Sequence, residues 1–345
     1  MNEFNLINQR KQDHINAVLQ DSGVDRQQTG FDQIQLRHCA LPEINFDQLD
    51  SQCELFGHTL SFPLLISSMT GGSGSQLEKI NRHLAEAAAD QQIALAVGSQ
   101  RVMMDSAEAQ SSFTIRRYAP KVPLLANIGA VQLNYGFGLD EAKRAVNCLE
   151  ADALILHLNP LQELIQPEGD RNFAGLCAKI ELLAQNLPVP IILKEVGCGL
   201  SGQDIQRGLD AGVRWFDLAG RGGTSWSRIE AQRAHQPGQQ ALGLLFQDWG
   251  YTTPQSLHNA RSFQDQARFI ASGGIRNGID MVKSVIMGGY VCGVAAPFLS
   301  PALQSTDAVI QTITEFKQAF QVAQFLVGAA STTDLFLNDA LLVQP

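Results

Sequence analysis

The chain has 345 residues, a formal net charge of −9 and a sequence pI of about 5.3. With 45% hydrophobic and 17% charged residues, it is not a disordered chain and can form a sizeable core. This acidic composition lacks the basic surface that nucleic-acid binding requires, so nucleic acid is not expected as a partner.

The expected cellular compartment is inferred from three patterns that the sequence lacks: a membrane span, a secretory signal and paired cysteines. No apolar run approaches the roughly 18 residues that a membrane span needs, and the N-terminus has no apolar segment of a secretory signal. The 6 cysteines include no CxxC pair, which favours reduced, mostly buried thiols over disulfides or a zinc site. We therefore expect a cytoplasmic protein with no membrane partner.

Residues 1–62 are predicted to form a helical arm followed by short strands. Eight short apolar runs follow, each ending at Gly, Ser, Asn or Thr. Continuous apolar runs of this length are typical of parallel strands that are buried on both faces. The runs are PLLISSM (63–69), IALAVG (93–98), PLLANIG (123–129), ALILHLN (153–159), PIILKEVG (190–197), WFDLAG (215–220), ARFIASGG (267–274) and YVCGVAAPF (290–298).

The stretches between these runs are amphipathic and are predicted to be helical, most clearly 75–91, 140–151 and 279–289. Eight strand–helix units favour a (β/α)8 TIM barrel. An open doubly wound sheet would normally show two similar halves around a switch point, and none is visible.

The barrel domain is expected to cover residues 63–345 behind the arm. Residues 225–252 are predicted to form a long loop after strand six, inserted before the helix of that unit. Long loops in such barrels usually lie at the active face and act as lids. Residues 303–328 are predicted to form the closing helices.

In such barrels the chemistry lies where the strands end. Glycine-rich segments follow strands six and seven, with Arg276 just after the second. Because glycines let backbone N–H groups approach a phosphate, a phosphate-bearing ligand is expected there. Lys194 interrupts an apolar strand. It either pairs with a neighbouring strand or directs its cation to the barrel mouth, and Glu195 must point the other way.

His157 and Asn159 share one face of strand four and lie close to Gln162 and Glu163, which suggests a polar wall for a substrate. Glu163 could provide the carboxylate of a Mg²⁺ site that waters and substrate phosphates complete. A single glutamate in a loop is more often simply solvated, so this signal is weak without further support.

A small cationic cluster, Arg10, Lys11 and His14, shares one face of the predicted N-terminal helix. Such a cluster is usually a solvated helix face. It gains significance only if the arm folds over the barrel mouth and meets a phosphate group.

The ordered motifs resemble those of the type 2 isopentenyl-diphosphate delta-isomerases, which are FMN-dependent (β/α)8 barrels. The resemblance covers nearly the whole chain, and the combination of MTGG, HLNPLQE and GGTSW is far more specific than any single glycine motif. The matching segments are RKQDHI (10–15), FPLLISSMTGG (62–72), VGSQR (97–101), ANIGAVQLN (126–134), LHLNPLQE (156–163), LKEVGCGLSG (193–202), DLAGRGGTSW (217–226), DWGYTTP (248–254) and ASGGIRNGID (271–280).

The resemblance implies an isomerase of isoprenoid biosynthesis. It would convert isopentenyl diphosphate to dimethylallyl diphosphate by a 1,3-allylic proton shift, with reduced FMN, Mg²⁺ and NADPH as reductant. It also implies a homo-oligomer, a tetramer or an octamer. Flavin N5 is the leading acid/base candidate, and we hypothesise that Gln162 relays or orients a proton, because an amide is a poor acid.

The same resemblance assigns roles to individual residues. His157 and Asn159 join Gln162 as catalytic candidates, and Glu163 becomes the Mg²⁺ ligand. The FMN contacts are Ser68, Met69, Thr70, Ser99, Asn127, Lys194, Thr224, Gly273, Gly274, Ile275, Arg276, Ala295 and Ala296, and the substrate contacts are Arg10, Lys11, Ser99, Gln100, Arg101 and Gln162.

Two alternatives and one departure from the family pattern stay open. An FMN-dependent 2-hydroxy-acid oxidase or dehydrogenase needs a His base near an Arg, but His258 lies in the helix before strand seven. A non-catalytic flavin-binding barrel would be expected to have lost the Gln162–Glu163 pair. Arg221 stands where the family usually has a small residue, and it either crowds the flavin phosphate or points to solvent.

The net charge of −9 does not exclude a small polyanionic ligand. A local cationic pocket can form within an acidic protein, with Mg²⁺ adding to it. We expect five cations to converge on the barrel mouth: Arg10, Lys11, Arg101, Lys194 and Arg276.

Overall fold

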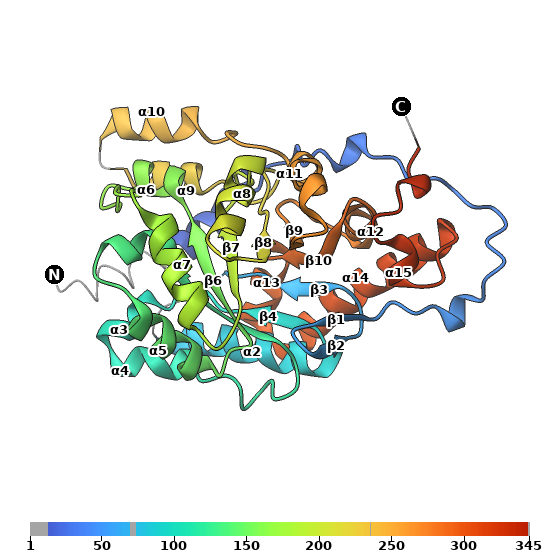
Figure 1. Cartoon of the computed structure of the whole chain (residues 1–345), viewed down its shortest axis with the longest axis horizontal. Helices are drawn as coiled ribbons and strands as arrows, with labels where there is room; N and C mark the ends of the chain where they lie inside the picture. The colour runs from blue at the N-terminus through green and yellow to red at the C-terminus, as the bar shows by residue number, and fades with distance from the viewer. Residues whose placement is uncertain (1–12, 70–73, 235, 344–345) are drawn as a thin grey trace.

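The computed structural model describes residues 13–69, 74–234 and 236–343. Eight parallel strands form a closed barrel in the order β10-β3-β4-β5-β6-β7-β8-β9 (Figure 1). The predicted (β/α)8 barrel is therefore confirmed. The strands are β3 (Leu64–Ile66), β4 (Ala94–Ala96), β5 (Leu124–Gly129), β6 (Ala153–Leu158), β7 (Ile191–Glu195), β8 (Trp215–Asp217), β9 (Arg268–Ser272) and β10 (Gly289–Val294).

Every strand lies within its predicted apolar run, except that β10 begins one residue earlier. These runs are continuously apolar because one face of each strand packs on the outer helices and the other faces the barrel interior. Leu65, Leu125, Ile192 and Ile270 belong to the interior cluster. Parallel pairing closes the sheet between β10 and β3, so each of the eight barrel strands has a neighbour on both sides.

A hairpin of β1 (Cys53–Leu55) and β2 (His58–Leu60) closes one end of the barrel. Its Leu55 and Leu60 are buried in the same cluster as the inward side chains of the barrel strands. Since this end is filled with apolar side chains, the cavity described below opens at the other end, where the strands finish.

The predicted helix over 75–91 is α2 (Ser75–Gln91), and the other two predicted helices differ from the observed ones by at most three residues at an end. Predicted residues 303–328 correspond mainly to α14. The remaining helices described are α3 (Arg101–Asp105), α4 (Ala107–Gln110), α5 (Leu139–Leu149), α6 (Pro160–Ile165), α7 (Leu176–Asn186), α8 (Gly202–Asp210), α11 (Thr253–Ala260), α12 (Gly278–Ile286), α13 (Ala296–Gln304), α14 (Thr306–Leu326) and α15 (Thr332–Leu335).

The long connection after β8 is present, but it is helical rather than irregular. It contains α9 (Trp226–Gln232) and α10 (Pro237–Leu245). Ser225 caps α9 by accepting a hydrogen bond from the Arg228 N–H, and Pro237 occupies the first turn of α10. Both helices pack beside α6 (Figure 1).

The N-terminal segment runs along the outside of the barrel from the cavity end to the hairpin (Figure 1). Residues 13–20 are helical. Isolated β-bridges then join Asp25 to Thr224 near the cavity and Asp50 to Ser331 near the hairpin. No helix in the described part of the chain is long and apolar enough to cross a membrane.

Candidate active site

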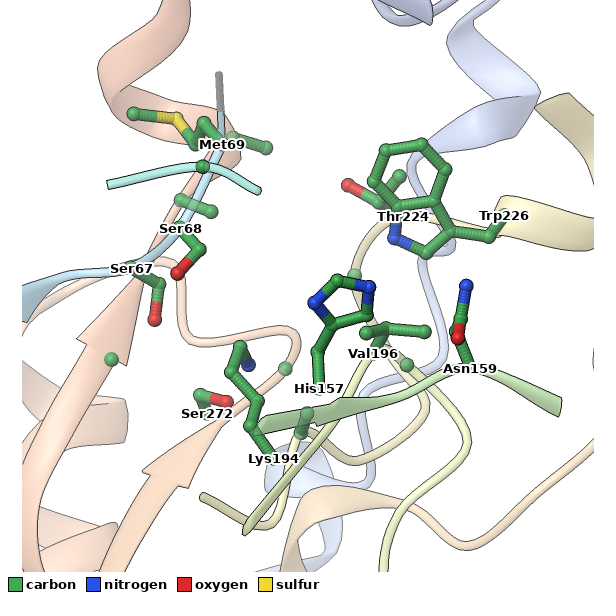
Figure 2. Close-up of a pocket in the computed structure, with 18 of the residues that line it drawn as sticks. Ser67, Ser68, Met69, His157, Asn159, Lys194, Val196, Thr224, Trp226 and Ser272 are labelled. Carbon is green, nitrogen blue, oxygen red and sulfur yellow. The ribbon is translucent and has the colours of Figure 1, made fainter. Parts of the chain in front are cut away.

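A cavity of about 1630 Å³, including the part of its mouth that is open to solvent, lies at the carboxyl ends of the strands (Figure 2). The fold brings most of the predicted site residues to its walls. The predicted residues that line it are Ser68, Met69, Ser99, Arg101, Asn127, His157, Asn159, Gln162, Glu163, Lys194, Thr224, Gly273, Gly274, Ile275, Arg276, Ala295 and Ala296.

Gln100 does not belong to this cavity. Its side chain is fully buried, donates to the Ala145 carbonyl over 3.0 Å and accepts from the Asn127 N–H over 2.9 Å. Both ends of the amide are therefore used inside the protein, and the expected substrate contact through this side chain is not supported. Arg10, Lys11 and Thr70 lie outside the described residues.

Lys194 borders the cavity where β7 meets β8. Lys194 and Asp217 are register partners, so both side chains point into the barrel. Lys194 Nζ lies 3.0 Å from Asp217 Oδ2, and Ser272 donates from Oγ to the other carboxylate oxygen. Asp217 is fully buried, whereas Lys194 and Ser272 also line the cavity (Figure 2). Both interpretations of Lys194 therefore apply: it forms an ion pair with Asp217, and it also places its cation at the cavity.

Glu195 faces the opposite side of β7, as strand alternation requires, and binds the loop that follows. Its Oε2 accepts hydrogen bonds from the N–H groups of residues 196–199, the first two over 2.6 Å. Burial raises the pKa of Glu195 to about 7, although these backbone N–H groups and the Lys194 charge act to lower it. The carboxyl group supports the cavity wall from behind.

His157 stands between Ser68 on one side of the cavity and Trp226 on the other (Figure 2). Its Nδ1 lies 2.8 Å from Asn127 Oδ1. Since Asn127 Nδ2 donates to Ser68 Oγ over 2.8 Å, the amide oxygen is the acceptor and His157 Nδ1 carries the proton. A Cβ at Gly129 would lie 3.0 Å from His157 Nε2, so this glycine leaves room for the ring.

Asn159, Gln162 and Glu163 form a connected wall where β6 leads into α6. Asn159 Nδ2 donates to Glu163 Oε1 over 2.8 Å and to Gln162 Oε1 over 3.2 Å. Gln162 Nε2 donates to Glu230 Oε1 over 2.9 Å, and the Asp170 N–H donates to Glu163 Oε2 over 2.8 Å. Carboxylate oxygens only accept hydrogen bonds, so Asn159 and Gln162 must each turn the amide nitrogen toward a carboxylate. Each of the two amides therefore has a single possible orientation.

Glu230, on α9, is a residue of this network that the sequence analysis missed. It is fully buried, and it accepts from His14 Nε2 over 3.0 Å and from Arg233 Nη1 over 2.7 Å. Burial opposes ionisation, but the hydrogen bonds from His14 and Gln162 and the Arg233 charge outweigh it and lower the pKa of Glu230 to about 2. No spacing in the sequence links residue 230 to residues 14 and 162, so only the fold could reveal it.

The apolar side of the cavity was also not located from the sequence. The Trp226 ring meets the His14 ring edge-on, with centroids 5.1 Å apart and an angle of 74°. His14, expected within a cationic cluster, thus packs against an aromatic ring while it donates to Glu230. The other apolar residues that line the cavity and that the sequence analysis did not select include Ile15, Val18, Leu77 and Leu299.

The loops after β8 and β9 meet backbone to backbone at the cavity. A Cβ on Gly273 would lie 1.9 Å from the Gly220 carbonyl oxygen, and Gly273 and Gly274 have φ values of +98° and +75°. Only glycine suits both positions, so the backbone itself forms this wall, as phosphate binding by N–H groups requires. Arg276 is tied here, because its Nη2 donates to Asp25 and, over 3.0 Å, to the Gly222 carbonyl.

The described cations at the cavity are all paired with acids. Arg101 Nη1 lies 2.9 Å from Asp170 Oδ2, and Lys194 and Arg276 have the aspartates given above. Arg221, the departure from the family pattern, does not line the cavity. Its N–H donates to the Tyr251 carbonyl over 2.7 Å, and it forms a β-bridge with Thr252, so it does not crowd a phosphate there.

Three buried polar atoms of the cavity lining have no hydrogen-bond partner in the described part of the chain: Ser67 Oγ, Gln132 Oε1 and Asn159 Oδ1. Buried polar atoms are rarely left unpaired, so these atoms fit a ligand that supplies the missing partners. The Asn159 oxygen and the Glu163 carboxylate are oxygen donors of the type that Mg²⁺ prefers.

Comparison with known proteins identifies the family. A model of the FMN-dependent dehydrogenases matches residues 7–123 and 170–342. An isopentenyl-diphosphate delta-isomerase of Hydrogenovibrio crunogenus is 65% identical and covers 98% of both chains. Those of Paracoccus zeaxanthinifaciens and Stutzerimonas stutzeri are 54% and 46% identical, each over 97% of both chains. The chain belongs to the isopentenyl-diphosphate delta-isomerase family. The match to an FMN-dependent model confirms the resemblance to its flavin-dependent type 2 members.

Solved structures support the fold of this family member. A flavocytochrome b2 variant with pyruvate bound superposes with a TM-score of 0.68 at 16% identity, covering 96% of this chain and 82% of that one. A mandelate oxidase variant with a monooxide FMN adduct gives a TM-score of 0.61 at 14% identity, covering 95% and 91%. At this identity the likeness concerns the fold alone.

Proposed function

We propose that this protein converts isopentenyl diphosphate to dimethylallyl diphosphate by a 1,3-allylic proton shift, using bound reduced FMN. One observation carries the proposal. Asn159 and Gln162, held in place by Glu163 and by the buried Glu230 behind them, line the same cavity as a glycine-lined wall suited to a phosphate and a buried lysine. The reaction must add a proton at one end of an alkene and remove another from the allylic carbon, which requires fixed groups and little water.

The residues that would hold FMN fall into two groups. Lys194 and Asn127 would contact the ring together with Ser68, Met69 and Ser99, while the Gly273–Arg276 turn and Thr224 would hold the phosphate, near Ala295 and Ala296. The unpaired Ser67 Oγ supports a polar ligand against the same wall. Reduced FMN would supply an electron-rich ring with an exchangeable proton beside the substrate.

The diphosphate would lie toward the mouth, near Arg101 and Ser99, with Arg10 and Lys11 contributing from the N-terminus. Glu163 would bind Mg²⁺ through the carboxylate. No group of three or more His, Cys, Asp or Glu side chains suited to a metal occurs among the described residues. The ion would therefore depend on Glu163, with the Asn159 oxygen nearby and with water and diphosphate oxygens completing its shell.

Gln162 would orient the proton transfer rather than act as an acid. Its nitrogen is held by the Glu230 carboxylate and its oxygen by Asn159, so the amide presents one fixed face to the cavity. Glu230 is ionised at neutral pH because its pKa is about 2. It therefore accepts the Gln162 and His14 hydrogen bonds and stabilises positive charge nearby. His157, fixed by Asn127, would complete the polar wall beside the alkene.

A 2-hydroxy-acid oxidase is less well supported by the site. Its substrate carboxylate would need an available arginine beside a histidine base. Arg276 is bound by Asp25 and the Gly222 carbonyl, and His258, on α11, does not line the cavity. NADPH as reductant, a barrel domain over 63–345 and a tetramer or octamer complete the proposal, and these points stay predictions.

The purified protein should be incubated without oxygen with isopentenyl diphosphate, FMN, Mg²⁺ and NADPH, and the products separated. Dimethylallyl diphosphate should form only when flavin and reductant are both present. Absence of this product would overturn the proposed reaction. Equal product formation without flavin would overturn the proposed mechanism. Lactate and mandelate serve as matched substrates for the oxidase alternative, and neither should be oxidised.

A further inference from the structure

We propose that Arg26, in the N-terminal segment, is a positioning residue for the cavity wall that the loops after β7 and β8 form. By holding these two loops in place, it sets the affinity of the cavity for its phosphate-bearing cofactor. This inference rests on the proposed function in taking that cofactor to be FMN. Arg26 is not part of any motif that the sequence analysis selected, and it lies behind the cavity wall rather than on it.

The Arg26 guanidinium binds four backbone carbonyl groups from three segments. Nη2 donates to Gly197 over 2.6 Å and to Thr224 over 3.0 Å, Nε donates to Gly223 over 3.1 Å, and Nη1 donates to Gln247 over 3.1 Å. The residue is only 7% exposed. A planar guanidinium with five donors suits this arrangement, because its N–H groups point in fixed, diverging directions toward the separate carbonyl groups.

The carbonyl groups that Arg26 binds belong to the cavity wall. Gly197, Gly223 and Thr224 all line the cavity. The two loops also touch directly, since a Cβ on Gly197 would lie 2.9 Å from the Thr224 carbonyl oxygen and 3.0 Å from Arg26 Nη2. Arg26 therefore joins the loop after β7 to the loop after β8 where Gly197 contacts Thr224.

Glu195 binds the N–H groups of the same turn whose Gly197 carbonyl group Arg26 binds. Its carboxylate accepts the N–H groups of residues 196–199, while Arg26 donates to the Gly197 carbonyl. The donors and an acceptor of one turn are thus bound by two buried side chains, Glu195 as acceptor and Arg26 as donor. Such a turn has little freedom to move, and neither side chain needs to contact a ligand to fix its position.

A second tie between the N-terminal segment and the barrel offers a control. Arg228, on α9, donates from Nε to Asp21 Oδ2 over 2.7 Å and from Nη2 to Asp21 Oδ1 over 3.1 Å. Neither Arg228 nor Asp21 lines the cavity. Arg228 Nη1 also donates over 2.9 Å to Gln247 Oε1, a side-chain atom and not the carbonyl that Arg26 binds. Weakening the Arg228 contacts therefore loosens the segment without removing a hydrogen bond from Gly197, Gly223 or Thr224, which separates simple tethering from positioning.

The test compares the variants Arg26→Lys and Arg228→Lys with the wild type. A lysine ammonium cannot reach four carbonyls in three directions, so it leaves buried acceptors of the wall unpaired. Flavin-free protein is titrated with FMN, the flavin visible circular dichroism is recorded, and kcat is measured at low and at saturating FMN. We expect Arg26→Lys to raise the FMN dissociation constant at least tenfold and to alter the dichroism. Saturating FMN should restore most of kcat.

Arg228→Lys should keep the FMN dissociation constant within twofold of the wild type. Equal effects of the two variants, or an unchanged constant in Arg26→Lys, would overturn the positioning role while leaving the proposed function intact. A wild type that binds no FMN would instead overturn the cofactor assignment, and this inference with it. If Arg26→Lys does not fold, Gly197→Ala disturbs the same contact from the loop side and should weaken FMN binding similarly; unchanged affinity there would also overturn the inference.

Discussion

Gln162 donates a hydrogen bond from Nε2 to Glu230 Oε1 over 2.9 Å, between residues that are 68 positions apart in the chain. The same oxygen accepts from His14 Nε2 over 3.0 Å. One carboxylate on α9 therefore connects the wall after β6 with the N-terminal helix. It also decides which end of the Gln162 amide faces the cavity.

Glu230→Gln should lower kcat by about 10²–10³-fold, within the range expected for removing a group that supports proton transfer. A glutamine at this position can donate as well as accept, so Gln162 loses its single orientation. Glu230 does not line the cavity, and FMN affinity should stay within twofold of wild type. Steady-state kinetics and an FMN titration measure both quantities, with the exposed Glu181→Gln as control. Unchanged kcat would show that Glu230 only supports the fold.

Glu163→Gln should raise the Mg²⁺ concentration needed for half-maximal activity at least tenfold, because an amide is a much weaker Mg²⁺ ligand than a carboxylate. The activity is measured across a Mg²⁺ titration at fixed substrate. Glu168→Gln, five residues away and with a half-exposed side chain, is the matched control and should behave like the wild type. A normal Mg²⁺ response in the Glu163 variant would mean that the metal is bound elsewhere.

Lys194→Met should weaken FMN binding at least tenfold and also destabilise the protein, because it leaves the fully buried Asp217 without its cationic partner. Removing one member of a buried ion pair costs about 3–5 kcal/mol. The double variant Lys194→Met/Asp217→Asn removes both charges and should regain most of the stability but not the affinity. Urea unfolding and FMN titration give the two readouts. Affinity that returns together with stability would contradict a direct contact between Lys194 and the flavin.

Glu195 predicts a pH dependence of stability. Its folded-state pKa is raised from 4.5 to about 7, so the native state binds the proton more tightly than the unfolded state. The resulting stabilisation is fully present below pH 4.5 and is lost as the pH rises through 7. At 1.36 kcal/mol per pKa unit it amounts to at most about 3 kcal/mol.

This dependence is measured by urea unfolding at pH 5 and pH 8 for the wild type and Glu195→Gln. Between these two pH values the wild type should lose about 2.5 kcal/mol relative to the variant, which has no proton to release at this position. A constant difference between the two proteins would contradict the raised pKa. It would indicate that the backbone N–H groups keep the carboxylate ionised throughout.

The strands were the best predicted part of the fold. Runs such as PIILKEVG are mostly apolar on both faces, and this pattern favours a strand that is covered on both sides, as in a parallel sheet surrounded by helices. Residues 225–252 were harder, because α9 and α10 are short and are stabilised by packing against α6 rather than by a strong sequence period. Motifs at strand ends, such as HLNPLQE, marked the cavity because every strand of such a barrel ends at the same face.

The sequence alone established the barrel and the end of it that carries the cavity, since these depend on local patterns and on strand direction. Its motifs, through the family resemblance they carry, also pointed to about half of the residues that line the cavity. The tertiary structure decided which partners hold those residues. Asp217 faces Lys194 through sheet register, while Glu230 reaches Gln162, and Arg26 reaches the loops after β7 and β8, across long stretches of chain. Such pairings depend on closure of the barrel and on the path of the N-terminal segment. Neither can be predicted from the spacing of residues in the sequence.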